Sequence, residues 1–477
     1  MRNVLNIRTF SSFAIGPIGT AALGFITLPL MTWLYSTEDI GRIGMLNIAI
    51  SFSVLLYSLG LDQSYVRQYH EEKSKYVLLK ISIFPGAILL IATFFILYFS
   101  SLSLSSILFD KNEFLVSLLS ALVLMACFLS RFLSLVLRMQ EKGLAYSVSQ
   151  IFPKLMTLLV IAYFLFFYKT HEFIQLMLAN TVGYLAVLLI LLWSTKSDWL
   201  PAIKAKFDYG KMLEMMFFGF PLILGGLAFW GITAMDRVFL RSYSTFDQLA
   251  IFSVAVSFSS AASIIQSIFS TIWAPMIYKI ADDKEKGINL VRTASSYMLI
   301  LVVFLFCLGG LFSWVVDLLL PAEYRDVKYI VIACIGLPLL YTLSETTVVG
   351  IGISRRTVYS MLASLLALVV NLISNYFMVP KFGAGGAAVS TCFTFWVFLI
   401  LRTEFSIISW NKIPRFEMYI FTGACVVGAS IGALYGDILR NELIFYWLLV
   451  LFFLILRNWS ALRKIKMSSL SELKDGN

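Results

Sequence analysis

The stretch YSTEDIGRIGMLNIAISFS, residues Tyr35–Ser53, occurs a second time as YSTFDQLAIFSVAVSFS, residues Tyr243–Ser259. Both copies begin with Tyr-Ser-Thr, have an aspartate two residues after the threonine, and end with Ser-Phe-Ser; the second copy is two residues shorter. Each copy follows a long apolar run and leads into another. A segment repeated at the same place between apolar runs indicates an internal duplication, so we predict two halves with matching series of helices.

Apolar runs of this kind occur along the whole chain. Of its 477 residues, 60% are hydrophobic and 13% are charged, and the mean hydropathy is +0.87, whereas soluble domains carry about 25% charged residues. Crossing a bilayer as a helix takes about 20 mostly apolar residues. The sequence therefore predicts an all-α integral membrane protein with about 14 transmembrane helices, at residues 10–35, 43–61, 78–99, 114–137, 146–168, 173–193, 212–235, 249–275, 293–319, 327–352, 358–379, 384–407, 416–435 and 442–459.

The duplication and the spans together predict three parts. Residues 1–200 form an N-lobe of six spans, residues 201–412 form a C-lobe of six spans, and residues 413–477 hold the last two spans and a tail. Because six is an even number, both lobes have the same orientation in the membrane. Parallel repeats of this kind occur in some transporters, with the substrate site between the repeats.

Lysine and arginine are distributed unevenly between alternate loops. The loops on the side of the N-terminus hold 26 of these residues, and the opposite loops hold 9. Positive residues concentrate in the cytoplasmic loops of membrane proteins, so we expect both termini in the cytoplasm. The apolar run at 10–35 is too long for the core of a signal peptide, and we expect it to be retained as the first span.

Several other classes of protein are not favoured. The net charge of +10 is spread over short loops, unlike the basic face of a nucleic-acid-binding module, so we expect no nucleic-acid partner. The five cysteines lie inside apolar runs, and the two histidines, His70 and His171, lie apart from them. We therefore expect no disulfide framework, no metal site and no cofactor.

One glycine-rich stretch imitates a nucleotide-binding loop. In NYFMVPKFGAGGAAVS, residues 375–390, Gly383, Gly385 and Ala388 fit the pattern G-x-G-x-x-[GA], which binds a pyrophosphate only between a strand and a helix. Here an apolar span precedes the pattern and ends at Pro380. We predict instead a tight turn at Gly383 and a following span that begins with small residues, against which a neighbouring helix packs closely.

Three basic residues in or directly after the fourth and fifth predicted spans are candidate site residues. Arg131 lies well inside the fourth span, and Arg138 is seven residues further along on the same helix face. Lys154 lies inside the fifth span beside Pro153. A charge near the centre of the bilayer costs at least about 2.5–3.5 kcal/mol and usually faces the bundle interior. Arg131, Lys154 and Arg138 are therefore candidate cavity residues; the alternative is that these side chains extend to the interface, which Arg138 reaches most easily.

Five acidic or basic residues are further candidates. Glu345 lies inside the tenth span and is a candidate for coupling to a proton or another cation. The other four either cap helices and form local ion pairs or line the mouths of a cavity. They lie at the ends of predicted spans and are Asp62, Arg67, Asp236 and Arg237.

Four segments resemble one family of transporters. They are LGLDQSYVRQYHEEK at residues 59–73, LRMQEKGLAYS at 137–147, MDRVFLRSYSTFD at 235–247, and the glycine-rich stretch at 375–390. Together with the number of spans, they make nearly the whole chain resemble the O-antigen-type polysaccharide flippases. These belong to the multidrug/oligosaccharidyl-lipid/polysaccharide exporter superfamily, with multidrug exporters and the lipid II flippase. The sequence departs from the family pattern at Asp247–Ala250, where an acidic residue and a glycine are common.

The resemblance implies a function and a substrate. It implies a flippase that moves undecaprenyl-pyrophosphate-linked oligosaccharide repeat units from the cytoplasmic to the outer leaflet of a bacterial inner membrane, by alternating access. The products would be surface polysaccharides such as O-antigen in lipopolysaccharide, capsule or exopolysaccharide. Cations inside the membrane would lower the cost of desolvating the diphosphate, and arginine suits phosphate oxygens. The implied partners, besides lipid, are a polysaccharide polymerase and chain-length proteins.

Two alternatives remain. The first is a cation-coupled multidrug exporter of the same superfamily; many of these have an acidic residue in the first span, and residues 10–35 contain no charged residue or histidine. The second is a membrane-embedded polysaccharide polymerase or ligase, which would need a long outer loop for its catalytic residues. Every outer loop predicted here has about fifteen residues or fewer, so we do not expect an enzyme.

Overall fold

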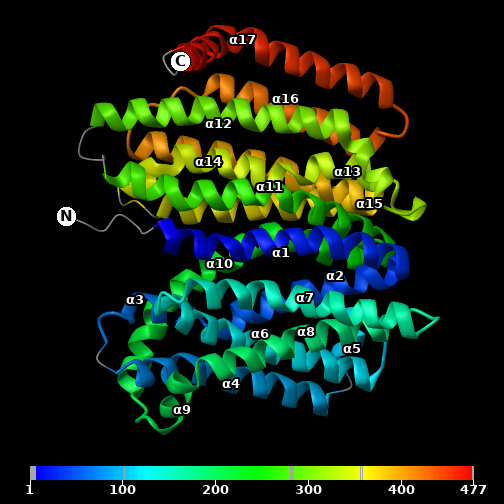
Figure 1. Ribbon diagram of the computed structural model, residues 1–477, viewed down its shortest axis with the longest axis vertical. Coiled ribbons are helices and arrows are strands. Elements are labelled where there is room, and N and C mark those ends of the chain that lie inside the picture. The colour runs from blue at the N-terminus through cyan, green and yellow to red at the C-terminus, as the bar shows by residue number, and fades with distance from the viewer. Residues whose placement is uncertain are drawn as a thin grey trace. The chain divides into compact units, whose positions relative to one another are not determined.

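The computed structural model describes residues 7–72, 74–100, 102–279, 284–354, 356 and 358–474. In this part of the chain every regular element is a helix, as the composition predicted, and two of the helices are short 3-10 turns (Figure 1). The elements in chain order are α1 (Ile7–Leu34), α2 (Thr37–Ser58), α3 (Leu61–Gln68), α4 (Lys75–Phe99), α5 (Leu104–Phe109), α6 (Phe114–Met139), α7 (Gly143–Phe167), α8 (Phe173–Ser194), α9 (Lys196–Lys204), α10 (Tyr209–Tyr243), α11 (Phe246–Lys279), α12 (Lys284–Phe312), η1 (Ser313–Leu318), η2 (Ala322–Tyr324), α13 (Val327–Cys334), α14 (Gly336–Ile353), α15 (Val358–Ser409), α16 (Phe416–Tyr435) and α17 (Arg440–Lys474).

Among the described residues, twelve helical segments are long and apolar enough to cross a membrane. Large apolar side chains point outward from the helices: Phe114, Phe166 and Phe217 are 76%, 80% and 79% exposed. Exposing such side chains to water is unfavourable, whereas lipid solvates them. The chain is therefore a multi-pass membrane protein.

The difference between twelve and the predicted fourteen has two sources. The eleventh and twelfth predicted spans both lie in α15, which counts once although its backbone breaks at Gly383, with φ +51° and ψ −126°. Glycine adopts a positive φ without strain. A Cβ atom on Gly385 would lie only 2.6 Å from the carbonyl oxygen of Ala433 in α16, so the predicted turn and close helix contact are both confirmed. The fourteenth predicted span lies in α17, whose described side chains end at Arg457.

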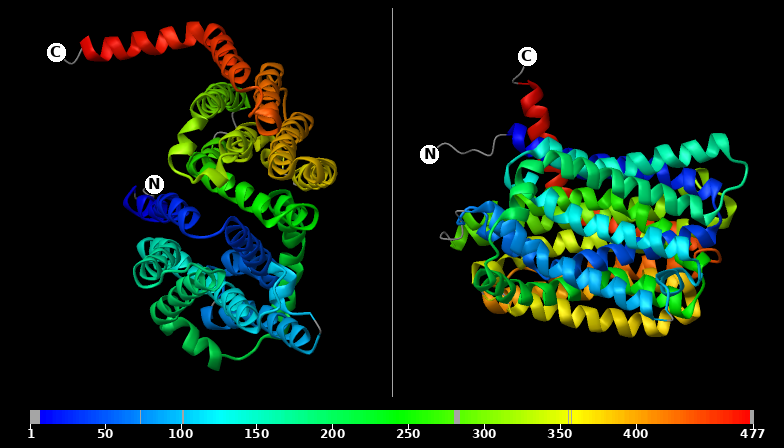
Figure 2. Two further views of the ribbon diagram at one scale, coloured as in Figure 1. Left: turned by 90° about the vertical axis from the view of Figure 1, so that its right-hand side faces the viewer. Right: turned by 90° about the horizontal axis from the view of Figure 1, so that it is seen from below.

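The chain divides into two compact units, residues 1–258 and residues 259–477. Unit 1 contains α1–α10 and the start of α11. Its helices lie side by side as a bundle, seen end-on in Figure 2, in which α1 packs on α7, α7 on α8, and α6 on both α8 and α2. α10 belongs to the same unit because it packs on α2, α3 and α4. The lobe boundaries expected from the sequence, at residues 200 and 412, stay predictions.

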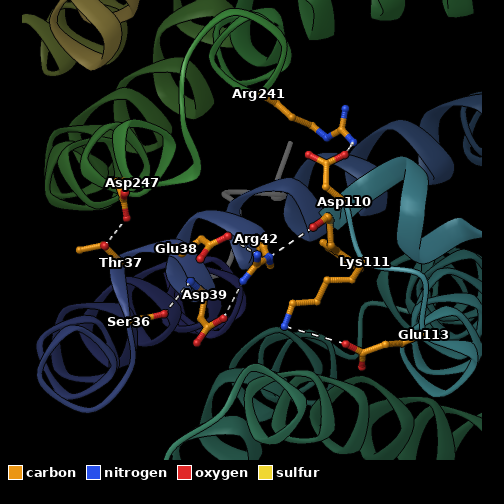
Figure 3. Close-up of polar contacts among 11 residues, drawn as sticks. Ser36, Thr37, Glu38, Asp39, Arg42, Asp110, Lys111, Glu113, Arg241 and Asp247 are labelled. Carbon is orange, nitrogen blue, oxygen red and sulfur yellow. Dashed lines mark hydrogen bonds and ion pairs between the residues drawn. The ribbon is translucent and has the colours of Figure 1, made fainter.

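The two copies of the repeat have the same local structure and contact each other within unit 1. Each copy forms the turn between two long helices, α1 and α2 in the first and α10 and α11 in the second. Thr37 of the first copy donates a hydrogen bond to Asp247 of the second (Figure 3). A Cβ atom on Gly41 would overlap the carbonyl oxygen of Phe246, so the backbones of α2 and α11 touch there.

Arginine side chains join the neighbouring elements around this contact (Figure 3). Arg42 is buried in α2, where its Nη1 lies 3.0 Å from a carboxylate oxygen of Asp39 and its Nε donates to the carbonyl oxygen of Phe109, 3.3 Å away. Arg241, near the end of α10, has its Nη2 2.7 Å from a carboxylate oxygen of Asp110. Polar contacts therefore join α2, α5, α10 and α11 at one end of unit 1.

Three short helices, α3, α5 and α9, occupy segments that the sequence analysis treated as loops. α3 and α9 both pack on α4, and α5 packs on α6. Leu61 and Tyr65 of α3 and Ala202 of α9 belong to a buried apolar cluster that also contains Phe132 of α6. These helices are too short to give an apolar run, and their few apolar residues become buried only through contacts with the longer helices.

Unit 2 contains the rest of α11 and α12–α17. In this unit α14 packs on the second half of α15 through small and hydroxyl-bearing residues. The hydroxyl oxygens of Thr347 and Thr403 are 2.7 Å apart, and the N–H of Gly350 donates to the hydroxyl of Ser406 over 3.1 Å. A Cβ atom on Gly350 would overlap the Ser406 hydroxyl. Small residues of this kind let membrane helices approach closely and form hydrogen bonds between them.

Candidate functional site

Arg131 and Arg138 lie on the side of α6 that faces away from its exposed apolar surface. Leu118 and Met125 belong to that apolar surface. Each precedes one of the two arginines by thirteen residues, which corresponds to roughly 140° around the helix. Cys127, which shares the side of the arginines, is buried. This placement does not fit side chains that face lipid; that Arg131 and Arg138 line a cavity stays a prediction.

Arg131 forms an ion pair with Asp62, and both residues were candidates from the sequence. Nη2 and Nε of Arg131 lie 2.6 Å and 3.2 Å from the same carboxylate oxygen, Oδ2 of Asp62. The side chain of Asp62 is 10% exposed, whereas that of Arg131 is 35% exposed. The positive charge therefore has a buried counter-charge beside it and is itself still accessible.

The backbone around α3 fixes the position of Asp62. α2 and α3 are joined by two consecutive residues of positive φ, of which Gly60 has φ +67°. This sharp turn places Asp62 in the first turn of α3, where the helix dipole favours a carboxylate. A Cβ atom on Gly60 would overlap the carbonyl oxygen of Gly219 in α10, and the Ser64 hydroxyl donates to the carbonyl oxygen of Met215 over 2.8 Å. α3 is thus held against both α6 and α10.

A second ion pair holds α10 to the segment that follows α3. Lys211, which precedes the membrane-crossing part of α10, donates from its ammonium to the carboxylate of Glu72. This hydrogen bond raises the pKa of Lys211 above its ordinary value. Burial raises the pKa of the Tyr65 and Tyr69 phenols nearby. At neutral pH the lysine is therefore charged, and both phenols are neutral.

Lys154 lies on the side of α7 that packs on α1. It follows the buried Ser147 by seven residues, and the exposed Leu159 is roughly 140° away around the helix. The position that a Cβ atom would take on Gly24 of α1 is 3.4 Å from the Lys154 Nζ, so the ammonium lies directly beside α1. Lys154 is exposed and has no hydrogen bond or ion pair with any residue that the structure describes.

Arg67 and Arg237 each contact an aromatic ring. The guanidinium carbon of Arg67 lies 4.2 Å from the ring centroid of Phe218 in α10, and that of Arg237 lies 5.5 Å from the ring centroid of Phe252 in α11. Cation–π contacts of this length stabilise a partly desolvated cation. Both arginines therefore have partners that the sequence analysis did not identify.

Asp236 and Arg237 lie inside a helix rather than at its end. The sequence analysis ended the seventh span at residue 235, but the membrane-crossing segment is Ile223–Tyr243. The apolar residues Val-Phe-Leu follow the charged pair and continue the helix. Asp236 is 1% exposed, so it is part of the packed interior of unit 1. A role at a cavity mouth stays a prediction for both residues.

In unit 2, Glu345 forms an ion pair that was not predicted. Its Oε1 lies 2.7 Å from Nη2 of Arg402, and Nη1 of Arg402 donates to the Ser344 hydroxyl over 2.6 Å. The side chains of Glu345 and Arg402 are 14% and 11% exposed. The rings of Tyr341 and Phe398 both lie 5.1 Å from the guanidinium carbon. Ion coupling by Glu345 stays a prediction, and it would require Arg402 to move away from the carboxylate.

Arg402 was missed because, although it falls within the predicted span at 384–407, it was counted among the basic residues of the loop that follows. α15 continues to Ser409, which places Arg402 two turns inside the helix. The sequence did contain a signal for the longer helix, because Thr403 and Ser406 follow Arg402 at the spacing of a packed helix face. In the structure both of these residues are fully buried. The structure thus brings Asp62 and Arg131 together and gives Glu345 a separate partner in unit 2.

Comparison with known protein families identifies the family of the chain. A family model described as polysaccharide biosynthesis protein matches residues 7–281. The chain belongs to the polysaccharide biosynthesis protein family. The matched segment covers unit 1 from residue 7 onward, and with it Asp62, Arg131 and Lys154.

Solved structures of transporters have a fold similar to that of this family member. The lipid II flippase MurJ in an inward closed conformation superposes with a TM-score of 0.67 at 16% identity, over 94% of this chain and 99% of that one. An inward-facing multidrug resistance MATE family transporter gives a TM-score of 0.55 at 14% identity, over 83% and 97%. The Vibrio cholerae MATE transporter VcmN gives 0.54 at 15% identity, over 85% and 97%. At these identities the likeness is one of fold.

Relatives by sequence include probable multidrug resistance proteins. The protein NorM of Bacillus anthracis is 25% identical over 207 residues, 40% of this chain and 44% of that protein. NorM of Bacillus cereus is 25% identical over 227 residues, 44% of this chain and 48% of that protein. This family member therefore matches less than half the length of these relatives.

Proposed function

We propose that this protein is a flippase for undecaprenyl-pyrophosphate-linked oligosaccharide units, which it moves from the cytoplasmic to the outer leaflet by alternating access. The membership of the polysaccharide biosynthesis family and the fold shared with a lipid flippase support the class of transporter. The substrate, the inner-membrane location, the cytoplasmic termini and the role in O-antigen or other surface polysaccharide synthesis belong to the proposal.

The observation that carries the proposal is the placement of two cations in unit 1. Arg131 and Lys154 lie on neighbouring helices, on the sides that face away from the exposed apolar surfaces, and both are accessible. Charges are costly inside a membrane and are kept where they bind or move a charged group. A diphosphate is a suitable group, because arginine binds phosphate oxygens through a planar pair of donors and lysine binds them as a point charge.

In this mechanism, unit 1 binds the diphosphate head group while the polyprenyl tail stays in lipid. The sugar units follow the head group through the protein when the two halves alternate between inward and outward access. The cations reduce the cost of removing the diphosphate from water, and they do so without forming a covalent bond. A polysaccharide polymerase and chain-length proteins would receive the unit at the outer leaflet.

The proposal is tested by deleting the gene and following lipid-linked sugars. We expect lipid-linked repeat units to accumulate on the inner leaflet and surface polysaccharide to be lost, with both effects reversed by the wild-type gene. Complementation by Arg131→Ala should fail although the protein is inserted at normal levels, as measured by a C-terminal tag. Normal surface polysaccharide in the deletion strain would refute the flippase.

The second candidate is a cation-coupled multidrug exporter, which is favoured by the similarity to the NorM proteins. In that case the deletion strain would become sensitive to toxic cations and keep its polysaccharide. Glu345, whose side chain is 14% exposed, would then be the residue to examine for ion coupling, since residues 10–35 contain no acidic group.

A further inference from the structure

Asp62 contacts only part of the Arg131 guanidinium. Both observed bonds, from Nε and Nη2, go to the single oxygen Oδ2. Nη1 has no hydrogen bond with any residue in the described part of the chain. Arginine has five N–H donors in one plane, so three remain: both on Nη1 and the second on Nη2. The end of the guanidinium formed by Nη1 and Nη2 is therefore open.

The carboxylate is held more firmly than the arginine. Asp62 lies in the first turn of α3, beside the side-chain amide of Gln63, which donates to the same Oδ2 over 3.2 Å. α3 is fixed by the turn at Gly60 and by the bond from Ser64 to α10. Asp62 is also the less exposed partner of the pair. The fixed carboxylate thus sets the direction of the longer and more mobile arginine side chain.

We propose that Asp62 is a positioning residue, which turns the Nη1–Nη2 end of Arg131 toward the phosphate of the transported lipid and limits how tightly that phosphate is held. This inference rests on the proposed function, because it assumes a phosphate-bearing substrate. Two parallel N–H bonds from this end match two phosphate oxygens. The negative charge of Asp62 repels the bound phosphate, which weakens binding and favours release at the other leaflet.

Arg131 and Lys154 differ in whether a carboxylate lies beside the positive charge. Lys154 has no acidic partner in the described structure, so no carboxylate offsets its charge. Arg131 provides hydrogen-bond donors in a fixed orientation, and Lys154 provides a positive charge without a paired carboxylate. A transporter needs both properties, since a site that binds a diphosphate too tightly would hold it through the cycle. The roles of the two cations can therefore be separated by substitutions at Asp62.

The test uses the full-length protein in lipid nanodiscs and two probes, undecaprenyl pyrophosphate in the bilayer and inorganic pyrophosphate in solution. Asp62→Asn keeps an oxygen that accepts a bond from Arg131 but removes the negative charge. We expect it to bind undecaprenyl pyrophosphate about tenfold more tightly, as expected for about 1.4 kcal/mol, while surface polysaccharide in complemented cells falls. Asp62→Leu also loses the positioning, and we expect it to bind about tenfold more weakly than Asp62→Asn.

The exchange Asp62→Arg with Arg131→Asp separates positioning from structure. It restores an ion pair, and with it the melting temperature, but moves the guanidinium into α3; we expect phosphate binding and polysaccharide to remain lost. Asp317→Asn is the matched control, because Asp317 pairs with Lys328 in unit 2, and it should leave binding unchanged. Both probes should show the same order of affinities if the diphosphate itself is recognised.

Four results would overturn the inference. One is an exchange variant that binds and transports as the wild type does. Another is an Asp62→Asn variant whose melting temperature falls while affinity and polysaccharide are unchanged, as expected of a purely structural pair. If the wild type binds neither probe, the proposed substrate class is wrong and the inference falls with it. If the wild type binds and the Asp62 variants bind equally well, the positioning role alone is wrong.

Discussion

At the scale of single residues, the charges inside the membrane fall into two kinds. Arg131 and Arg402 have carboxylate partners, Asp62 and Glu345, whereas Lys154 has none among the described residues. A paired charge contributes to holding helices together, and its loss leaves the partner uncompensated. A charge without a partner destabilises the fold and is expected where the function requires it. Removing a paired charge should therefore lower the stability of the protein, whereas removing the unpaired charge should raise it.

Replacing Lys154 with methionine should stabilise the protein and inactivate it. Methionine has nearly the same length and removes a charge whose cost inside the membrane is at least about 2.5 kcal/mol. We expect a higher melting temperature of the purified protein together with a loss of surface polysaccharide in cells. Lys206→Met, at an exposed position outside the spans, is the control and should change neither. A lower melting temperature for Lys154→Met would mean that Lys154 has a structural role.

Replacing Glu345 with alanine should have the opposite effect. It leaves Arg402 buried without a counter-charge, and breaking a buried pair in this way costs about 3–5 kcal/mol. We expect a markedly lower melting temperature, a smaller loss for Glu345→Gln, which keeps an acceptor for Arg402, and partial recovery in Glu345→Ala with Arg402→Met. Equal melting temperatures for the alanine and glutamine variants would contradict the observed ion pair.

At the scale of helices, close contacts depend on glycines at particular positions. α2 touches α11 at Gly41, and the second copy of the repeat has Leu249 at the corresponding position. Gly41→Leu would place a large side chain against the Phe246 backbone, and overpacking of this kind costs about 1–3 kcal/mol or more. We expect a lower melting temperature and less inserted protein. Gly225→Ala in α10 is the control, since a Cβ atom there would meet nothing within 4 Å.

The helices themselves were largely predictable, because long apolar runs and the turn at Gly383 are local features of the sequence. α3 was not, since its eight residues are shorter than any span and are helical only where α4, α6 and α10 surround them. The pairing of Asp62 with Arg131 depends on α3, so it could not be predicted either. The sequence identified both residues as candidates, but their contact follows from packing between segments 69 residues apart.

At the scale of the whole molecule, the orientation in the membrane is a prediction from the uneven distribution of Lys and Arg. The five natural cysteines are buried, so new cysteines report on accessibility with little background. Lys169→Cys, between α7 and α8, should react with a membrane-impermeant maleimide in intact spheroplasts. Lys142→Cys, between α6 and α7, should react only after the membrane is opened. The reverse pattern would show that both termini face outward.

The contact between the two copies of the repeat also bears on how the chain evolved. Before the predicted duplication, a shorter ancestor would have made this contact between two identical subunits. Two subunits related by a two-fold axis make every contact twice, so the ancestor would have had two equivalent copies of it. Thr37 still bonds Asp247, but Asp39, the counterpart of Asp247, is now held by Arg42, and the second copy has Ala250 where the first has Arg42. The predicted duplication accounts for this asymmetry, because fusion into one gene would let the two sides of the contact diverge.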